Sequence, residues 1–299
     1  MLTNLALFVA TVLSVLLAGN QGILVGEEPL TLASLWKGWT FMVPLMTILL
    51  AHEFGHYIAA RIHRVPASLP YFIPMPISPI GTMGAIIAMR GRIGSRKALL
   101  DIGASGPIAG MVFAVPILIW GLLHSEVHVI TGNGLMEGQC LLYSLLKWLT
   151  VGPIPEGSDV FLHPAAFAGW VGLLITMINL VPVGQLDGGH VAYALVGPKQ
   201  DIIAKIVHYG LLLVFAVNFG YHVLARLGTE TIGATIGKAF ELSMFWLVWF
   251  VFLFVLRWLS GGNHPPTGPS ELDWGRKAIA IGCMLLFVLL FMPTPLSQY

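Results

Sequence analysis

The chain has 299 residues, of which 57% are hydrophobic and only 10% are charged. Soluble domains carry about 25% charged residues, so this composition excludes an ordinary water-soluble protein and indicates one embedded in a lipid bilayer. The formal net charge of +1 argues against a nucleic-acid partner, which would require a clustered basic surface.

Long apolar runs divide the chain into candidate membrane spans, each of which needs about 20 apolar residues. Seven runs are candidates: 3–20, 37–62, 98–123, 161–183, 202–225, 240–259 and 277–293. No basic segment precedes the first run, so we expect a membrane span there and not a cleavable signal peptide. The sequence therefore predicts an all-α polytopic membrane protein with about seven transmembrane helices.

Two regions between these runs do not fit the pattern of straight spans. Residues 65–93 contain five prolines and then Gly81 and Gly84. Prolines remove backbone donors and break helices, and irregular backbone at membrane depth needs shelter by protein or a water-filled cavity. A re-entrant loop or short β-hairpin, with an extended strand over 81–89, is therefore expected. Residues 124–160 are polar and Gly-rich and indicate a loop with a short interfacial helix near 141–149.

The basic residues predict the orientation, because Lys and Arg are enriched in cytoplasmic loops. With a cytoplasmic N-terminus and seven alternating spans, eleven basic residues lie inside and four lie outside. The inner set is Arg61, Arg64, Arg90, Arg92, Arg96, Lys97, Lys199, Lys205, Arg257, Arg276 and Lys277, and the outer set is Lys37, Lys147, Arg226 and Lys238. The longest cytoplasmic connection is the Pro/Gly-rich segment 260–274.

The second run contains the motif H-E-x-x-H, formed by His52, Glu53 and His56. Residues four apart lie on one face of a helix, about 5–6 Å apart, so both imidazoles can reach one metal ion while the glutamate lies beside it as a general base. Glu53 is roughly 12 Å of helix from Arg61, which places it in the hydrocarbon zone, where an ionisable residue indicates function. The alternative is a hydrogen-bonded cluster between helices.

Catalytic zinc takes three protein ligands and leaves a position for water. Asp187 ends the fourth run, where Pro182, Gly184, Gly188 and Gly189 indicate a broken helix. Both motifs lie toward the cytoplasmic side in the predicted orientation, so they can converge. The alternative for Asp187 is an ordinary cap at a helix N-terminus.

These motifs resemble the site-2 protease family of intramembrane zinc metalloproteases. The resemblance is carried by His52-Glu-Phe-Gly-His56 followed by Asn179-x-x-Pro182-x-x-x-Leu186-Asp187-Gly188. Gly81-Thr82-Met83-Gly84-Ala85 is similar to an element of the EGY-type and related bacterial branch, and 104–110 is similar to the start of the third core helix. The resemblance covers roughly 37–200, without a PDZ or CBS domain.

The resemblance implies one Zn²⁺ ion bound by His52, His56 and Asp187, with Glu53 as catalytic base. It also implies that Asn179 contacts substrate or the developing oxyanion, although an intramembrane Asn is otherwise commonly a bond between helices.

The same resemblance implies substrate contacts from the 81–85 element, namely Gly81, Thr82 and Gly84. Small residues at 103, 104, 106, 109 and 110 would let the third core helix approach the catalytic helix. His190 is expected to pack or to support the site, since a fourth protein ligand would close it.

The expected organisation is an N-terminal helix and loop (1–36), a catalytic core (37–200) and C-terminal helices (201–299). The implied activity is hydrolysis of peptide bonds in membrane-spanning substrates, such as an anti-sigma factor or another membrane-tethered regulator, as in regulated intramembrane proteolysis. We expect a bacterial plasma membrane, since no transit peptide precedes the first span. Two alternatives stay open: a catalytically silent membrane binding protein on the same scaffold, and an ion transporter that uses the buried His, Glu and Asp.

Overall fold

The computed structural model describes residues 1–20, 31–89, 91, 93–130, 135–229, 231–259, 264–265, 267–268 and 270–298. Arg90 and Arg92, two of the basic residues behind the predicted orientation, and parts of the 260–274 segment lie outside these residues. The helices are α1 (Leu2–Asn20), α2 (Leu32–Lys37), α3 (Trp39–Ile62), α4 (Arg96–Leu123), α5 (Leu141–Val151), α6 (Pro164–Asn179), α7 (Asp187–Val196), α8 (Gln200–Arg226), α9 (Ile232–Leu259) and α10 (Trp274–Leu290). The strands are β1 (Tyr71–Pro74), β2 (Thr82–Ile86), β3 (Glu126–Val129), β4 (Leu135–Glu137), β5 (Ser158–Phe161) and β6 (Leu296–Gln298).

Five helical stretches in the described residues are long and apolar enough to cross a membrane. They are Leu2–Asn20, Leu35–Ile62, Arg96–Leu123, Asp187–Arg226 and Ile232–Leu259. The predicted spans 161–183 and 277–293 correspond to α6 and α10, which have 16 and 17 residues. At 1.5 Å per residue these helices are about 25 Å long, less than the roughly 30 Å of a hydrocarbon core. The polytopic membrane class is confirmed, whereas the count of seven spans stays a prediction.

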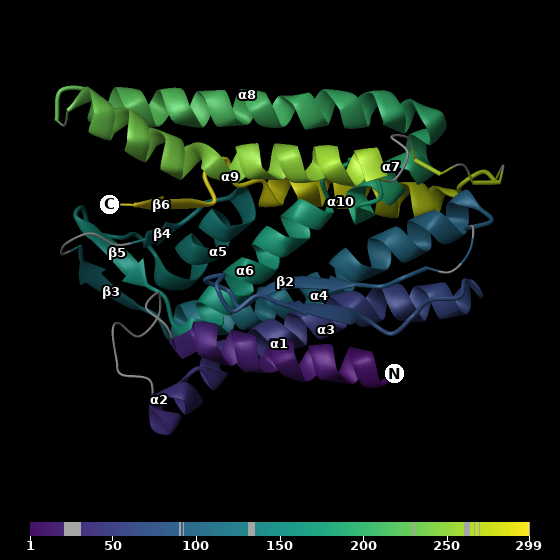
Figure 1. The fold of residues 1–299 in the computed structure, drawn as a ribbon, viewed down its shortest axis with the longest axis horizontal. Helices are drawn as coiled ribbons and strands as arrows, with labels where there is room; N and C mark the ends of the chain where they lie inside the picture. Colours follow the sequence, from purple (N-terminus) through teal and green to yellow (C-terminus); the bar gives the residue numbers. More distant parts are fainter. Residues whose placement is uncertain are drawn as a thin grey trace.

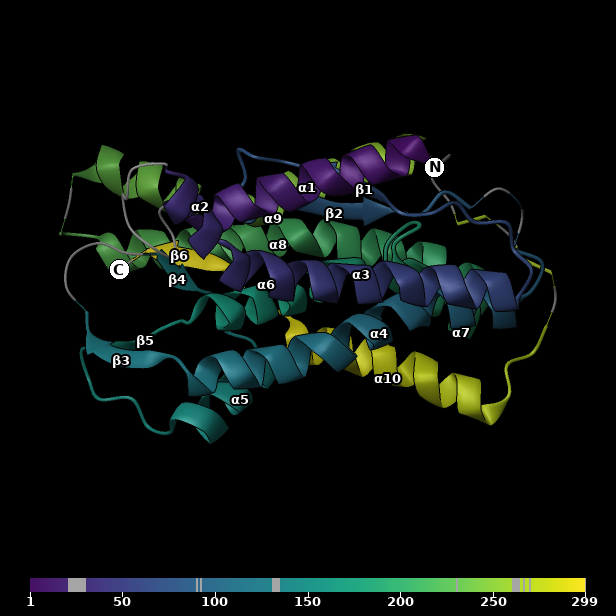
Figure 2. The ribbon, with the colours of Figure 1, turned by 90° about the horizontal axis from the view of Figure 1, so that it is seen from below.

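Helices α3, α4 and α6 form the centre of the molecule (Figures 1 and 2). Helix α6 is mostly buried, and its Trp170 packs in the same core as Phe41 of α3 and Leu118 of α4. Small residues let these helices approach closely: a Cβ atom on Gly169 of α6 would lie 2.7 Å from the Cβ atom of Leu118. Helices α8 and α9 form a hairpin along one side of this core, and α1 lies along the other (Figure 1).

The outward surface of α8 is apolar. Its exposed side chains recur every three or four residues and so share one helical face: Ile202, Ile206, Tyr209, Leu213, Val217, Tyr221 and Leu224. A contiguous apolar stripe of this length is unfavourable in water and matches contact with lipid tails.

Strands β1 and β2 form an antiparallel pair within 65–93, the region where the sequence predicts a re-entrant loop or β-hairpin. Gly81 immediately precedes β2 and has φ +76°, and a side chain there would collide with the α1 backbone at Ser14 and Val15. Ser14 Oγ donates to the Gly81 carbonyl at 2.6 Å. The hairpin is therefore fastened to α1, and its entry into the membrane stays a prediction.

The expectation of an all-α fold with a loop at 124–160 is incomplete. The predicted helix is present as α5, but β3 pairs with β5, and β4 pairs with the C-terminal β6. Strands of three or four residues are too short to show a period-two pattern, and the partner of β4 is distant in sequence.

A buried ionic cluster joins this region. Lys147 Nζ of α5 lies 3.0 Å from both Glu137 Oε1 and Asp159 Oδ1, and Tyr143 Oη donates to the same Glu137 oxygen at 2.8 Å. The Lys147 side chain is 9% exposed, so its single positive charge is shared by the two carboxylates away from bulk water.

Candidate metal centre

Helix α3 presents His52, Glu53 and His56 to the interior, and all three are buried. Glycines of α4 make room for the two imidazoles. A Cβ atom on Gly106 would overlap the ring of His56, and one on Gly110 would lie 3.3 Å from Nδ1 of His52. The small residues expected to allow close helix approach thus leave space for the imidazoles themselves.

The tautomer of His56 is fixed by its surroundings. His56 Nδ1 lies 2.7 Å from the carbonyl oxygen of Ile102, so it carries the proton and donates. Nε2 then has a lone pair directed at the site. A hydrogen bond from the other ring nitrogen commonly orients metal-binding histidines in this way.

Asp187 reaches the two histidines because the chain breaks between α6 and α7. Gly188 and Gly189 lie so close to the carbonyls of Leu180 and Gly184 that side chains would collide there. Asp187 is the first residue of α7 and not its cap, since Leu186 occupies the cap position without a side-chain bond. The alternative of an ordinary capping aspartate is therefore wrong.

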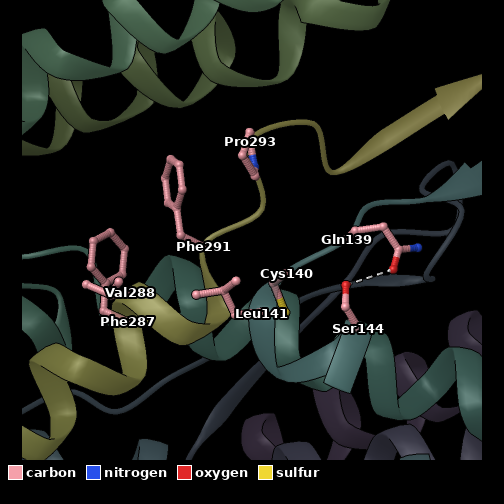
Figure 3. A pocket seen from close by; sticks show the side chains of 8 residues that line it. All are labelled: Gln139, Cys140, Leu141, Ser144, Phe287, Val288, Phe291 and Pro293. Carbon is pink, nitrogen blue, oxygen red and sulfur yellow. Dashed lines mark hydrogen bonds between the residues drawn. The ribbon is translucent and has the colours of Figure 1, made fainter. Parts of the chain in front are cut away.

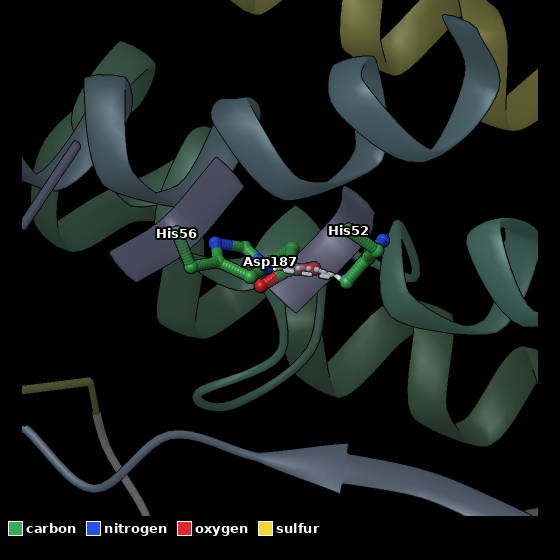
Figure 4. Close-up of side chains that lie close together, drawn as sticks. All are labelled: His52, His56 and Asp187. Atoms are coloured by element: carbon green, nitrogen blue, oxygen red, sulfur yellow. Dashed lines mark hydrogen bonds and ion pairs between the residues drawn. The ribbon is translucent and has the colours of Figure 1, made fainter. Parts of the chain in front are cut away.

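Three ligand atoms face one another (Figure 4). Asp187 Oδ2 lies 3.3 Å from His52 Nε2 and 3.2 Å from His56 Nε2, and the two Nε2 atoms are 3.2 Å apart. A tetrahedral zinc site with bonds of roughly 2.0–2.1 Å has edges of about 3.3–3.4 Å between ligand atoms. The triangle thus fits one zinc ion in both donor chemistry and size, and it leaves a coordination position for water or substrate.

Glu53 lies beside this triangle and is 6% exposed. Its carboxylate has no hydrogen bond or ion pair with any residue in the described part of the chain. A carboxylate that is buried but not engaged is available for proton transfer.

Asn179, the last residue of α6, also reaches the site. Its Nδ2 lies 3.2 Å from Nε2 of His52, although the two residues are 127 positions apart. The amide therefore lies at the edge of the ligand triangle, where it can donate to a ligand atom or to a bound substrate.

Strand β2 contacts α3, but among the described residues no hydrogen bond joins the 81–85 element to His52, His56 or Asp187. Gly81 packs on α1, and Thr82 donates to the carbonyl of Ile73 at 3.0 Å and accepts from the amide of Gly84. Gly84, at φ +90°, has open space where a side chain would lie. Thr82 thus holds the hairpin together, and the expected substrate contacts of these residues stay predictions.

Two further residues that support the site are not indicated by any sequence motif. Arg96 of α4 donates from Nε and Nη2 to the carbonyls of Ala194 and Leu195 at 2.8 and 2.9 Å, which caps the C-terminal end of α7. His264 contacts His190, with 2.8 Å between Nε2 and Nδ1. Neither contact has a local signal, because both partners lie far away in the sequence.

A cavity of about 800 Å³ adjoins the α6–α7 turn. Its walls come from the end of β2 and the residues that follow it (86–89), from 183–186, from the end of α9 and from His264, Pro265 and Thr267, and His190 lines it. A second cavity of about 600 Å³ lies between α5 and α10 (Figure 3). Its lining is apolar apart from Gln139, Cys140 and Ser144, so it holds no metal-binding group of the kind found at His52.

The comparison with known families decides the identity of this arrangement. The sequence pattern of peptidase family M50 matches residues 40–217, more than half of the chain and all of the ligand triangle. The chain belongs to this family. M50 is the family of the site-2 proteases, so the resemblance seen in the motifs is confirmed.

Several curated plant proteins are similar to this M50 member. It is 29% identical to the probable zinc metalloprotease EGY1, chloroplastic, of Arabidopsis thaliana, over 83% of this chain and 42% of that protein. It is 35% identical to the EGY1 protein of Oryza sativa subsp. japonica, over 56% of this chain and 30% of that protein. The chain thus spans less than half the length of these relatives. No solved structure matches it significantly.

Proposed function

We propose that this chain is an intramembrane zinc metalloprotease that hydrolyses peptide bonds of membrane-spanning proteins. The ligand set would be His52, His56 and Asp187, with Glu53 as catalytic base. One observation carries the proposal: a triangle of two imidazoles and one carboxylate, with edges of 3.2–3.3 Å, adjoins a buried glutamate that has no partner among the described residues.

The residues of the chain have separate roles in this reaction. Zinc bound at the triangle supplies Lewis acidity for hydrolysis at neutral pH. Glu53 accepts a proton from the attacking water and later delivers it to the leaving amine. The amide of Asn179, 3.2 Å from His52 Nε2, donates to the oxygen that gains negative charge. His56 keeps its proton on Nδ1 through the Ile102 carbonyl, so Nε2 stays free for the metal.

The substrate must expose a peptide bond. Backbone groups within a transmembrane helix are already hydrogen-bonded, so the substrate unwinds locally and presents an extended segment. Strand addition to the hairpin near 81–89 supplies new partners for that segment. The proposed class of substrate is a membrane-tethered regulator, such as an anti-sigma factor. Residues 37–200 would form the catalytic core, flanked by the segments 1–36 and 201–299.

The proposed orientation has a cytoplasmic N-terminus and an active site toward the cytoplasmic face, in a bacterial plasma membrane. The excess of Lys and Arg in the predicted inner loops supports the orientation. The relatives from Arabidopsis thaliana and Oryza sativa are named as chloroplast proteins. Single cysteines introduced at Arg61 and Lys238 can be labelled in sealed vesicles from the native source. This experiment tests both the orientation of the chain and the membrane in which it lies.

The decisive experiment compares Glu53→Gln with Asp187→Asn in purified protein. Glu53→Gln should abolish cleavage of a single-span reporter protein while bound zinc stays near one ion per chain. Asp187→Asn should lower both zinc content and cleavage. Turnover by Glu53→Gln would remove Glu53 from its role, and full zinc content in Asp187→Asn would point to another third ligand.

The same preparations separate the two other functions. Zinc binding without cleavage by the wild type would indicate a silent binding protein. Ion flux in reconstituted vesicles without cleavage would indicate a transporter.

A further inference from the structure

His190 of α7 lies about one helical turn from the ligand triangle. A Cβ atom on Gly103 would be 2.9 Å from the Cβ atom of His190, whereas Gly106, one turn later on α4, adjoins His56. His190 is also part of the wall of the cavity next to the α6–α7 turn. It is thus close to the proposed reaction centre without belonging to the triangle.

The hydrogen bonds of His264 fix the tautomer of His190. His264 Nδ1 lies 2.8 Å from the carbonyl oxygen of Pro265 and must donate to it. In neutral His264, Nε2 then carries a lone pair and accepts from His190 Nδ1 at 2.8 Å. The remaining nitrogen of neutral His190, Nε2, is therefore an acceptor.

His264 is itself held from two sides. Its ring stacks on Tyr193 with centroids 4.2 Å apart, and its backbone amide donates to Asp201 Oδ1 at 3.0 Å. The donor of His190 is thus engaged by a fixed partner. Among the described residues, Nε2 of His190 has no hydrogen-bond partner, so its lone pair is available to whatever enters the cavity.

Another wall of the cavity is the extended segment 87–89 after β2, one side of which has no hydrogen-bond partner among the described residues. The amide and carbonyl of Ala88 are both used by Ser68 on the β1 side. Backbone groups alternate in direction along a strand, so those of Ile87 and Met89 face away from Ser68. An extended peptide paired there still has a second edge, whose N–H groups need acceptors when water is excluded.

We propose that His190 is a substrate-binding residue whose Nε2 accepts a hydrogen bond from a backbone N–H of the unwound substrate segment in this cavity. The inference rests on the proposed protease function and names the backbone amide as the group recognised. His264 is a positioning residue, because it acts by holding the His190 tautomer. Because His190 would bind the backbone of the substrate and not a side chain, this contact would favour any substrate that unwinds, whatever its sequence.

The test measures binding without cleavage. Zinc-loaded Glu53→Gln protein in detergent is titrated into a fluorescein-labelled, acetylated octapeptide of alternating Val and Ala, and anisotropy gives the Kd. Analogues that replace one backbone amide at a time by an ester lack a single N–H donor. With His190 present, the ester at one position should raise the Kd roughly two- to tenfold more than esters at the neighbouring positions. This factor corresponds to the loss of one net hydrogen bond.

Variants at position 190 identify the acceptor. His190→Leu should remove the position-specific ester penalty, whereas His190→Gln, whose amide oxygen reaches a similar place, should restore it. His264→Phe keeps a ring against Tyr193 but cannot accept from Nδ1, so the penalty should shrink. His222→Leu, a histidine of α8 outside the cavity, should leave it unchanged, and zinc content reports whether each variant is folded.

An equal ester profile in His190→Leu and its parent would overturn the inference. Absence of peptide binding to the parent would overturn it as well, since the cavity would not accept an extended segment. Neither result touches the proposed protease function, which is judged separately by zinc content and reporter cleavage.

Discussion

Gly106 of α4 lies against the imidazole of His56 so closely that even a methyl group at position 106 would overlap the ring. Gly106→Ala should therefore displace His56 Nε2 from the ligand triangle, and zinc affinity should fall at least tenfold. Metal analysis after dialysis against a zinc buffer measures this directly.

Two further alanine substitutions, at Gly110 and Gly282, should reduce zinc binding less than Gly106→Ala does. At Gly110 the added Cβ atom would lie 3.3 Å from His52 Nδ1, so the ring needs to shift only slightly and the loss should be smaller. Gly282→Ala in α10 meets open space and should keep zinc fully. Equal zinc content in all three variants would contradict the close-contact explanation.

Arg96 fixes the position of α7 from its far end, through the carbonyls of Ala194 and Leu195. Arg96→Gln removes these charge-assisted bonds, so α7 and with it Asp187 should be held less firmly. We expect zinc affinity to fall several-fold while the protein stays folded. Lys97→Gln, the adjacent cation, has no such contact in the described residues and should bind zinc like the wild type.

Lys147 forms ion pairs with both Glu137 and Asp159 in a buried cluster. Lys147→Met keeps the stem but leaves two buried carboxylates facing each other, which should cost about 3–5 kcal/mol of stability. Thermal melting in detergent should show a fall of several degrees. Glu126→Gln breaks the exposed Glu126–His128 pair and should change the melting temperature little.

Burial lowers the pKa of His264 below its usual value near 6.5. The folded protein therefore binds a proton here less readily than the unfolded chain, and stability is lost as the pH falls below about 6.5 toward the folded pKa. The neighbouring charged or titratable groups are His190 and Tyr193 on α7, Asp201 on α8 and Arg257 on α9, which lines the same cavity.

The melting temperature measured from pH 7.5 to 5 should fall more steeply in wild type than in His264→Phe, which has no group to titrate at this position. Parallel curves would show that another residue dominates the acid sensitivity in this range.

The three residues of the ligand triangle could be predicted from the sequence for two reasons. Two of them are related by helical spacing, and the third follows a helix break that the sequence marks. Helical spacing alone places His52 and His56 on one face, and Pro182 with its neighbouring glycines indicates the turn that brings in Asp187. The relation of Asn179 to His52 had only the motif resemblance to support it, since no spacing argument connects residues in different helices.

The remaining contributors depend on contacts between distant segments. Arg96 and His264 occur in ordinary polar surroundings in the sequence, and only the contacts of α4 and of His264 with α7 give them a role. Likewise β4 forms only because the C-terminal strand lies beside it. The number of membrane spans could not be predicted because it depends on helix length. Helices α6 and α10 are apolar enough to suggest that they cross the membrane, but they end sooner than the apolar runs predicted there.

The break between α6 and α7 has a consequence for the life of the protein in the cell. Asp187 enters the site on a short helix that follows an irregular turn, and the histidines come from a different and much longer helix. A bound ion would therefore act as a cross-link that closes a long loop of chain, as a disulfide does in a secreted protein. Under zinc starvation the unlinked turn would be the first segment exposed to housekeeping proteases, so metal supply would set the abundance of this protein as well as its proposed activity.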